Sequence, residues 1–234
     1  RLVVIGAGYI GLEMGSVWSR LGSSVTVVEF LDNIVPNVDL EVAKHFHRNL
    51  QKQGLNFMLG TKVIQADLND KGVALLAESV NGGRQQKIDC DVLLVAVGRK
   101  PSTDNLGLEE LGVKRDKNGF LCVNDKLETS VANILAIGDC IPGPMLAHKA
   151  EEDGVAAVEM IAGGSAHIDH NLVPSIIYTH PEVASVGKTE EHLKSQNIDY
   201  NVGKFPFSAN SRARANDDTN GFVKILADSV SEKY

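Results

Sequence analysis

The residues whose types and spacing most clearly indicate chemistry lie at the start of the chain. Gly6, Gly8 and Gly11 form the pattern G-x-G-x-x-G between an apolar segment and a segment with helical spacing. In such a turn the first glycine allows a tight bend, the second lets a pyrophosphate approach the backbone, and the third allows close packing of helix on strand. The start of the helix also offers free amides and a positive dipole end to phosphates. The pattern therefore predicts a dinucleotide-binding turn.

Glu29 indicates which dinucleotide this turn prefers. It closes the next β-branched run, 18 residues after Gly11. A carboxylate in that position accepts hydrogen bonds from the ribose hydroxyls of adenosine and would repel a 2′-phosphate. No arginine follows within residues 30–32. NAD is therefore favoured over NADP, although the turn alone would also suit FAD.

A second candidate site follows the apolar segment 134–137, which ends in Gly138 and Asp139. An aspartate at the end of a strand can accept hydrogen bonds from a polyol, although a lone Gly-Asp is also a common turn cap. The loop 142–148 then leads into an alanine-rich helix, whose first amides could face an anionic ligand group. Because reduced flavin is negatively charged along one edge, this combination favours a flavin site.

The elements that must position these residues predict an α/β fold with a Rossmann-like first domain. Residues 2–5, 10–21 and 24–28 form a strand, a helix and a strand, a βαβ unit of the usual length. Further elements are expected as a helix over 38–54, strands over 56–59, 62–66 and 91–97, and a hairpin of 72–80 with 86–90 around Asn81-Gly82-Gly83.

Polar and Pro-containing residues after Gly98 place a domain boundary near residue 100. The expected domains are 1–100, 101–170 and 171–234. The second contains strands near 120–123 and 134–137 and a helix over 146–161, and the third contains strands over 200–206 and 222–226.

The bulk properties are those of a soluble globular protein, with 43% hydrophobic and 23% charged residues among 234. A net charge of −7 gives no reason to expect nucleic acid or an anionic membrane as partner. No apolar run approaches the roughly 18 residues of a membrane span. Three widely spaced cysteines favour neither a disulfide scaffold nor a zinc site. The chain opens with Arg1 directly before a strand, so we expect a piece of a longer protein.

Four stretches together resemble the dihydrolipoamide dehydrogenase branch of the FAD- and NAD(P)-dependent disulfide oxidoreductases. They are GAGYIGLEMGSVWSRLGSSVTVVEF, AVGRKP, TSVANILAIGDCIPGPMLAHKAEEDG and PSIIYTHPEVASVGKTEE. The resemblance implies an NAD domain, a central domain that completes the FAD site, and the start of an α+β dimerisation domain.

The same resemblance implies a role for each candidate residue. Glu29 would hold the adenosine ribose, Glu13 would lie near the nicotinamide, and Gly98 would line the NAD channel. Asp139 would bind the ribityl chain of FAD. The residues lining the flavin would be Met145, Leu146, Ala147 and His148.

The implied reaction oxidises a lipoamide dithiol to its disulfide and passes a hydride to NAD through an enzyme disulfide and FAD. The redox cysteines are expected upstream of residue 1 and the acid/base pair beyond residue 234, so no catalytic residue and no turnover are expected of this chain by itself. The implied partners are a second copy and the lipoyl domains of 2-oxoacid dehydrogenase complexes. The implied location is the mitochondrial matrix, or the cytoplasm for a bacterial source.

Two alternatives stay open: a glutathione or mercuric reductase type of enzyme, and a non-catalytic NAD-binding module. Several conspicuous residues favour structural roles instead. His180-Pro181-Glu182 is interpreted as structural, His167 and His170 as surface residues without a metal, and the three cysteines as small buried side chains. Arg212 and Arg214 are expected in a solvated loop.

Overall fold

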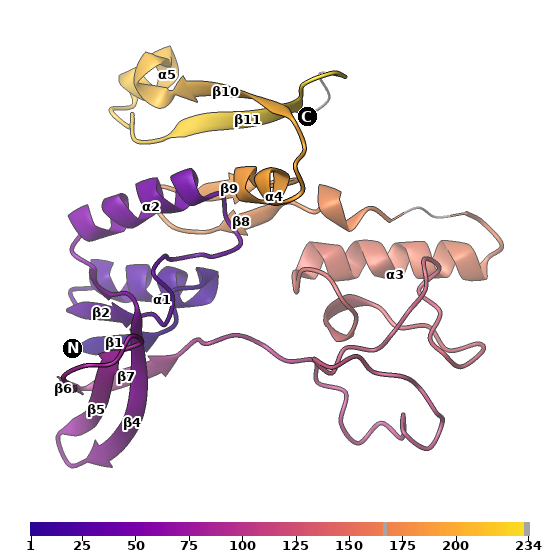
Figure 1. Cartoon of the computed structure of the whole chain (residues 1–234), viewed down its shortest axis with the longest axis horizontal. Coiled ribbons are helices and arrows are strands. Elements are labelled where there is room, and N and C mark those ends of the chain that lie inside the picture. The colour runs from indigo at the N-terminus through magenta and orange to yellow at the C-terminus, as the bar shows by residue number, and fades with distance from the viewer. Residues whose placement is uncertain (166–167, 232–234) are drawn as a thin grey trace. The chain divides into compact units, whose positions relative to one another are not determined.

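The computed structural model describes residues 1–165 and 168–231, which form two compact units (Figure 1). The first unit contains residues 1–98 and the residues from 176 onward, and the second contains residues 99–175. This division differs from the three expected domains, because most of the segment expected as a third domain belongs to the same unit as residues 1–98. The cause is packing, since Ile177 and Val183 are buried in the core that the N-terminal residues form.

The centre of the first unit is a parallel sheet in the order β3-β2-β1-β7. Its strands are β1 (Leu2–Ile5), β2 (Val25–Val28), β3 (Asn56–Met58) and β7 (Val92–Val95). Helix α1 (Tyr9–Arg20) connects β1 to β2, which pair in parallel with Leu2 opposite Val25. The predicted βαβ unit and the α/β fold class are confirmed.

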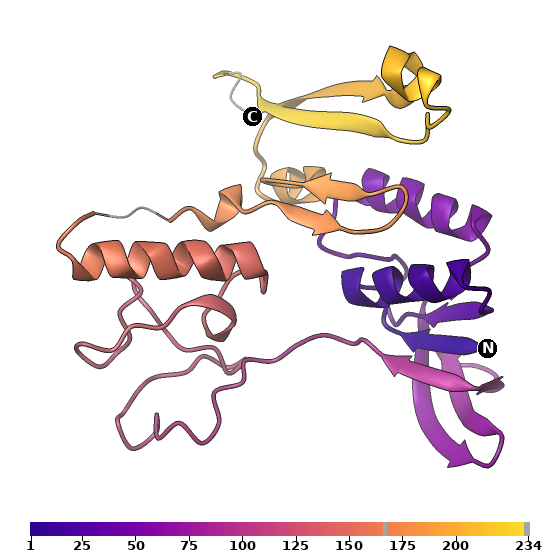
Figure 2. The same ribbon diagram turned by 180° about the vertical axis from the view of Figure 1, so that it is seen from behind.

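Alternating side chains of this sheet enter two different cores, as the period of a strand requires. Val4 and Val27 point into a core that contains Leu12 of α1 and Phe46 of α2 (Leu40–Lys52). Figures 1 and 2 show both helices on this side of the sheet. Val3 points to the opposite side, so a buried strand with two covered faces explains the continuous apolar run at the start of the chain.

An antiparallel three-stranded sheet covers that opposite side. It consists of β4 (Thr61–Asn69), β5 (Gly72–Ser79) and β6 (Gln86–Cys90), and Leu75 and Cys90 provide its buried contacts. The predicted hairpin of β5 and β6 is confirmed. Strand β4 is longer than expected because residues up to Asn69 continue to pair with β5.

The C-terminal part of the first unit holds two pairs of strands and two short helices. The elements are β8 (Ser175–Ile177), β9 (Val183–Ser185), α4 (Glu190–Ser195), β10 (Tyr200–Pro206), α5 (Ser211–Ala215) and β11 (Phe222–Asp228). The expectation of a loop at Arg212 and Arg214 is wrong, since both lie in α5. The side chain of Asn210 caps this helix by accepting a bond from the Ala213 N–H at 3.0 Å.

The second unit is built around helix α3 (Ala147–Ile161) and a core that includes Leu121, Leu127 and Ile141. The strands expected near 120–123 and 134–137 do not form, and the described residues of this unit have only the single bridges Arg115–Leu121 and Glu128–Leu135. The reason is local turn chemistry: the side chains of Asp116 and Asn124 each accept two backbone N–H bonds, which bends the chain beside each bridge. Within the described residues, no helix is long and apolar enough to cross a membrane.

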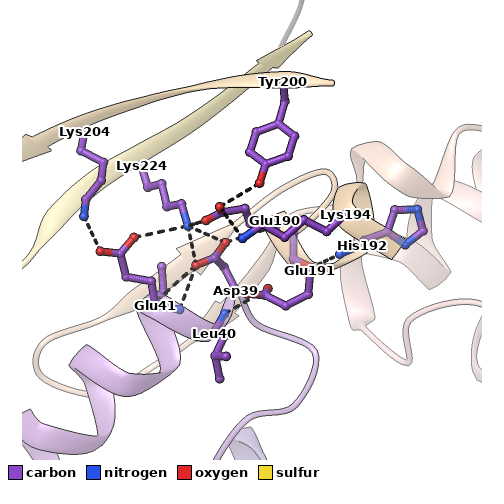
Figure 3. A network of polar contacts seen from close by, with 12 residues as sticks. Asp39, Leu40, Glu41, Glu190, Glu191, His192, Lys194, Tyr200, Lys204 and Lys224 are labelled. Carbon is purple, nitrogen blue, oxygen red and sulfur yellow. Dashed lines mark hydrogen bonds and ion pairs between the residues drawn. The ribbon is translucent and has the colours of Figure 1, made fainter. Parts of the chain in front are cut away.

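A buried ammonium group ties three elements of the first unit together (Figure 3). Lys224 of β11 has only 4% of its side chain exposed, and its Nζ lies 2.9 Å from both carboxylate oxygens of Asp39 and 2.5 Å from Glu190 Oε2. Asp39 also caps α2 by accepting the N–H groups of Glu41 and Val42. We call Lys224, Asp39, Glu41 and Glu190 the Lys224 cluster.

The pKa values in the Lys224 cluster follow from this pairing. Hydrogen bonds from Lys194, Lys224 and Tyr200 lower the pKa of Glu190 to about 2. Burial alone would raise the pKa of Asp39, but bonds from Lys224 and the Glu190 N–H outweigh it and hold that pKa below its usual value. Burial alone would likewise lower the pKa of Lys224, yet the two carboxylates raise it. All three groups are therefore charged at neutral pH.

We expect Lys224→Met to lower the free energy of unfolding of the first unit by about 3 kcal/mol, because it leaves buried carboxylates without their cation. Denaturant unfolding at pH 7 measures the loss. Lys62→Met is the matched control: Lys62 pairs with Glu78 at 2.8 Å but is 44% exposed, so its loss should stay below about 1 kcal/mol. Equal losses in the two variants would contradict the importance of burial.

Candidate functional site

The glycine turn has the backbone geometry that a dinucleotide site needs. Gly6 has a φ of +102°, and a Cβ there would lie 2.3 Å from the Ala96 carbonyl oxygen. A Cβ on Gly11 would lie 2.3 Å from the Gly6 carbonyl oxygen, whereas one on Gly8 would meet no atom within 4 Å. The first and third glycines are thus required by the packing of the turn, and the second leaves open the side from which a ligand would approach.

Helix α1 presents uncompensated amides at this open side. Gly8 is its N-cap residue and offers no capping side chain, and no acidic residue lies in the first turn. The first amides of a helix have no acceptor within the helix itself. A phosphate group is the kind of ligand that satisfies them.

Glu29 lies directly beside the glycine turn. Its Oε2 accepts the Ala7 N–H at 2.6 Å and its Oε1 accepts the Leu31 N–H at 2.9 Å, while the side chain stays half-buried. Two backbone amides therefore fix the carboxylate in place. Because a carboxylate oxygen has more than one acceptor direction, both oxygens can still receive hydroxyl groups of a ribose.

Glu13 and Gly98 lie at the margins of this arrangement. Glu13, on α1, accepts the Tyr178 N–H at 2.8 Å, a contact that sequence reasoning did not foresee. Gly98 is exposed just beyond β7, whose end adjoins the turn through Ala96. The structure brings the three glycines and Glu29 together, and the roles expected for Glu13 and Gly98 stay predictions.

The second candidate site is a single 3-10 turn, Gly138–Cys140, in the second unit. Asp139 has 35% of its side chain exposed and pairs through Oδ2 with the guanidinium of Arg99 at 2.7 Å. Its carboxylate therefore reaches the surface with a cation beside it.

A buried ion pair beneath this turn holds its backbone. Asp153 Oδ2 accepts the Gly138 N–H at 3.0 Å, and Lys149 Nζ donates to the Gly138 carbonyl oxygen at 3.0 Å. Lys149 and Asp153 lie 2.7 Å apart and are 1% and 0% exposed. Sequence reasoning missed both residues, although their i, i+4 spacing on an otherwise apolar face of α3 was a usable signal.

His170 completes the Lys149–Asp153 pair. Its Nε2 lies 3.0 Å from Asp153 Oδ1, a contact that the expectation of a surface histidine did not include, and 32% of its side chain is exposed. Burial alone would raise the pKa of Asp153, but bonds from Lys149, His170 and the Gly138 N–H hold it below its usual value. His167 lies outside the described residues.

The start of α3 resembles that of α1. Leu146 is its N-cap residue, no side chain caps the helix, and its first turn contains no acidic residue. His148 contacts the Pro174 carbonyl oxygen through Nε2 at 2.7 Å. Met145, Leu146 and His148 are half-buried and Ala147 is exposed, so this segment combines apolar surface with free amides.

The other conspicuous residues have no shared site. The His180 carbonyl oxygen accepts the side-chain amide of Gln53 at 2.6 Å, and Glu182 is exposed. Cys90 is buried, but Cys140 is only half-buried and Cys122 is exposed, so the expectation of burial is wrong for Cys122.

Comparison with known proteins identifies the family to which the chain belongs. Residues 1–154 match the family described as pyridine nucleotide-disulphide oxidoreductase, and residues 173–233 match the dimerisation domain of that family. The chain belongs to the pyridine nucleotide-disulphide oxidoreductase family. The predicted family resemblance is confirmed, and the two matched regions together account for most of the chain.

Individual members of this oxidoreductase family are similar over the whole chain. Dihydrolipoyl dehydrogenase 2, mitochondrial, from Arabidopsis thaliana is 59% identical over 233 residues, which cover 100% of this chain and 46% of that protein. The mitochondrial dihydrolipoyl dehydrogenase of Cricetulus griseus is 56% identical, with 46% of it covered. The crystal structure of LpdA from Mycobacterium tuberculosis has a TM-score of 0.88 at 27% identity, covering 98% of this chain and 49% of that one. The chain spans about half the length of these relatives.

We expect Lys149→Met to destabilise the second unit by about 3 to 5 kcal/mol, since it leaves Asp153 charged, buried and short of a partner. Hydrogen exchange should show the Gly138 amide opening much more often, and denaturant unfolding should show the loss of stability. Lys194→Met is the matched control, because Lys194 pairs with Glu190 at the same i, i+4 spacing but is 62% exposed. An unchanged Gly138 amide in Lys149→Met would contradict the role given to the pair.

Proposed function

We propose that the intact protein containing this chain is a dihydrolipoyl dehydrogenase that oxidises a dihydrolipoyl dithiol to its disulfide and delivers a hydride to NAD. The observation that carries the proposal is an identity of 56–59% to proteins of that name over all of the chain. The geometry of the two turns supports the proposal independently, because each offers the groups that a dinucleotide would need.

The first turn is proposed to bind NAD. Gly8 leaves space for the pyrophosphate, the amides of α1 meet its charge, and Glu29 receives the adenosine ribose. Because two amides hold the Glu29 carboxylate in place, it cannot easily move away from the 2′-phosphate of NADP, and the repulsion between the two negative charges disfavours NADP. Glu13 and Gly98 are proposed to border the nicotinamide end.

The second turn is proposed to bind part of FAD, a cofactor that would relay two electrons between a dithiol and NAD. Asp139 would accept hydroxyl groups of the ribityl chain, and the Lys149–Asp153 pair would keep its turn in place. The amides of Ala147 and His148, in the first turn of α3, would face the anionic edge of the flavin. The low pKa of Asp153 keeps that pair charged across the neutral range.

The proposed partners are a second copy of the protein and lipoyl domains of 2-oxoacid dehydrogenase complexes, in the mitochondrial matrix. The match of residues 173–233 to a dimerisation domain supports the second copy. So does the face of β10 and β11 opposite Lys224, where Phe205, Val223 and Ile225 are each 44–49% exposed. The mitochondrial names of the relatives support the location.

The function can be tested with the purified intact protein. We expect a yellow protein with bound flavin that reduces NAD with dihydrolipoamide as donor, and that has little activity with NADPH and glutathione disulfide. Absorption spectra and the two assays measure these outcomes. A flavoprotein active only with NADPH would replace the proposal by a glutathione or mercuric reductase type, and a colourless protein would favour an NAD-binding module.

We expect Glu29→Ala in the intact protein to weaken NAD binding at least tenfold, because it removes charge-assisted hydrogen bonds to the ribose. Flavin content should stay at the parent level, since Asp139 lies in the other unit. Titration of NAD by protein fluorescence measures the affinity. Glu110→Ala, an exposed carboxylate of the second unit, is the charge-matched control. Parent-like NAD affinity in Glu29→Ala would exclude the assigned role.

A further inference from the structure

A cleft of about 520 Å³ lies in the first unit, and none of its lining residues belongs to either candidate dinucleotide site. Helix α2 lines one side with His45 and Arg48. Lys204 of β10, and Ser208 and Thr219 from the segment between β10 and β11, line the other. All five side chains can donate hydrogen bonds.

The charge of this cleft opposes that of the whole chain, which is −7. Glu41 also lines the cleft, where its carboxylate pairs with Lys204 and lies 3.3 Å from Lys224 (Figure 3). Within the part of the chain that the structure describes, no carboxylate lies within 4.0 Å of Arg48. Arg48 therefore brings an unpaired positive charge to the cleft, while the ammonium group of Lys204, whose charge Glu41 balances, brings further N–H donors.

Two rings, those of His45 and Phe222, also line the cleft. The ring of His45 meets that of Phe222 edge-on at 5.3 Å, and Lys204 Nζ lies 5.4 Å from the centre of the Phe222 ring. The side-chain amide of Asn49 lies 3.1 Å from His45 Nδ1. If that amide donates, the proton of the neutral imidazole is on Nε2, where it can serve as a donor.

The geometry points to this cleft as a binding site for a small organic anion whose phosphate or carboxylate group is held by Arg48 and Lys204. The fork of a guanidinium suits either group, and charge-assisted bonds of this type are about twice as strong as neutral ones. The apolar part of the ligand lies against Phe222, and the hydroxyls of Ser208 and Thr219 complete the contacts. The inference does not depend on the proposed function.

The titration of His45 gives the site a pH dependence. Burial, followed by the charges of Arg48 and Lys52, lowers the pKa of His45, while Glu41 raises it. Lys204 and Lys224 are the cations that the opposite sheet contributes. A bound anion favours the imidazolium, so binding should tighten as the pH falls through the His45 pKa.

The test is a titration of the intact protein with phenyl phosphate and with benzoate, followed by calorimetry or NMR, with phenol as the neutral control. We expect saturable binding of one or both anions, none of phenol, and a loss of about tenfold in affinity for Arg48→Gln and for Lys204→Gln. Lys44→Gln removes the same charge from an exposed position on α2 outside the cleft, and its affinity should match the parent.

Two results would overturn the inference: no saturable binding of either anion, or the same loss in Lys44→Gln as in Arg48→Gln, which indicates only general attraction to a basic helix. The relative affinities for the two anions identify the charged group that the cleft prefers. NAD titrations of the same variants separate this question from the proposed function, because none of the three substitutions touches Glu29 or the glycine turn.

Discussion

A buried or half-buried carboxylate that accepts backbone N–H groups is the interaction on which this structure depends. Glu29 accepts the Ala7 N–H, Asp153 accepts the Gly138 N–H, and Asp39 accepts the amides that begin α2. A turn cannot satisfy such amides within itself, and leaving them buried without an acceptor costs about 1 to 3 kcal/mol each. The carboxylates thus fix the turns while also placing negative charge beside them.

The negative charge of each of these carboxylates must in turn be compensated, by a cation where the side chain is buried and by water where it is exposed. Asp153, fully buried, has Lys149 and His170 as partners, and Asp39 has Lys224. Glu29 is only half-buried and holds no ion pair among the described residues, because water can solvate it. Burial therefore separates the carboxylates that can only be structural from the one that remains available to a ligand.

The fold of residues 1–98 of the first unit could be predicted from the sequence because its signals are local. The apolar run before Gly6, the helical spacing after it and the β-branched run before Glu29 each specify one element and together specify a right-handed βαβ unit. The glycine pattern adds the turn. The candidate residues Gly6, Gly8, Gly11 and Glu29 follow from the same signals, so the first candidate site needed no tertiary information.

The second unit could not be predicted as well, for the opposite reason. Turns at Asp116 and Asn124 replace its expected strands. The side-chain oxygens of these two residues accept backbone N–H groups that a strand would use for pairing, and the strand propensity of a sequence does not include such bonds. The i, i+4 spacing of Lys149 and Asp153 could have indicated a buried pair, but not that the pair holds a turn more than ten residues earlier in the chain. The sequence thus indicated Asp139 as a candidate residue, but it did not indicate that Lys149 and Asp153 hold the turn in which Asp139 lies.

The contrast between Asp139 and Asp153 shows how one short turn can combine rigidity with access. Asp153 is 0% exposed and holds the backbone of Gly138, while Asp139 is 35% exposed and pairs with Arg99, which is itself 51% exposed. An exposed ion pair contributes at most about 1 kcal/mol, so a polar ligand can compete for Asp139 at little cost. The buried pair is too costly to break, which means that a ligand can rearrange the surface pair without disturbing the turn that presents it.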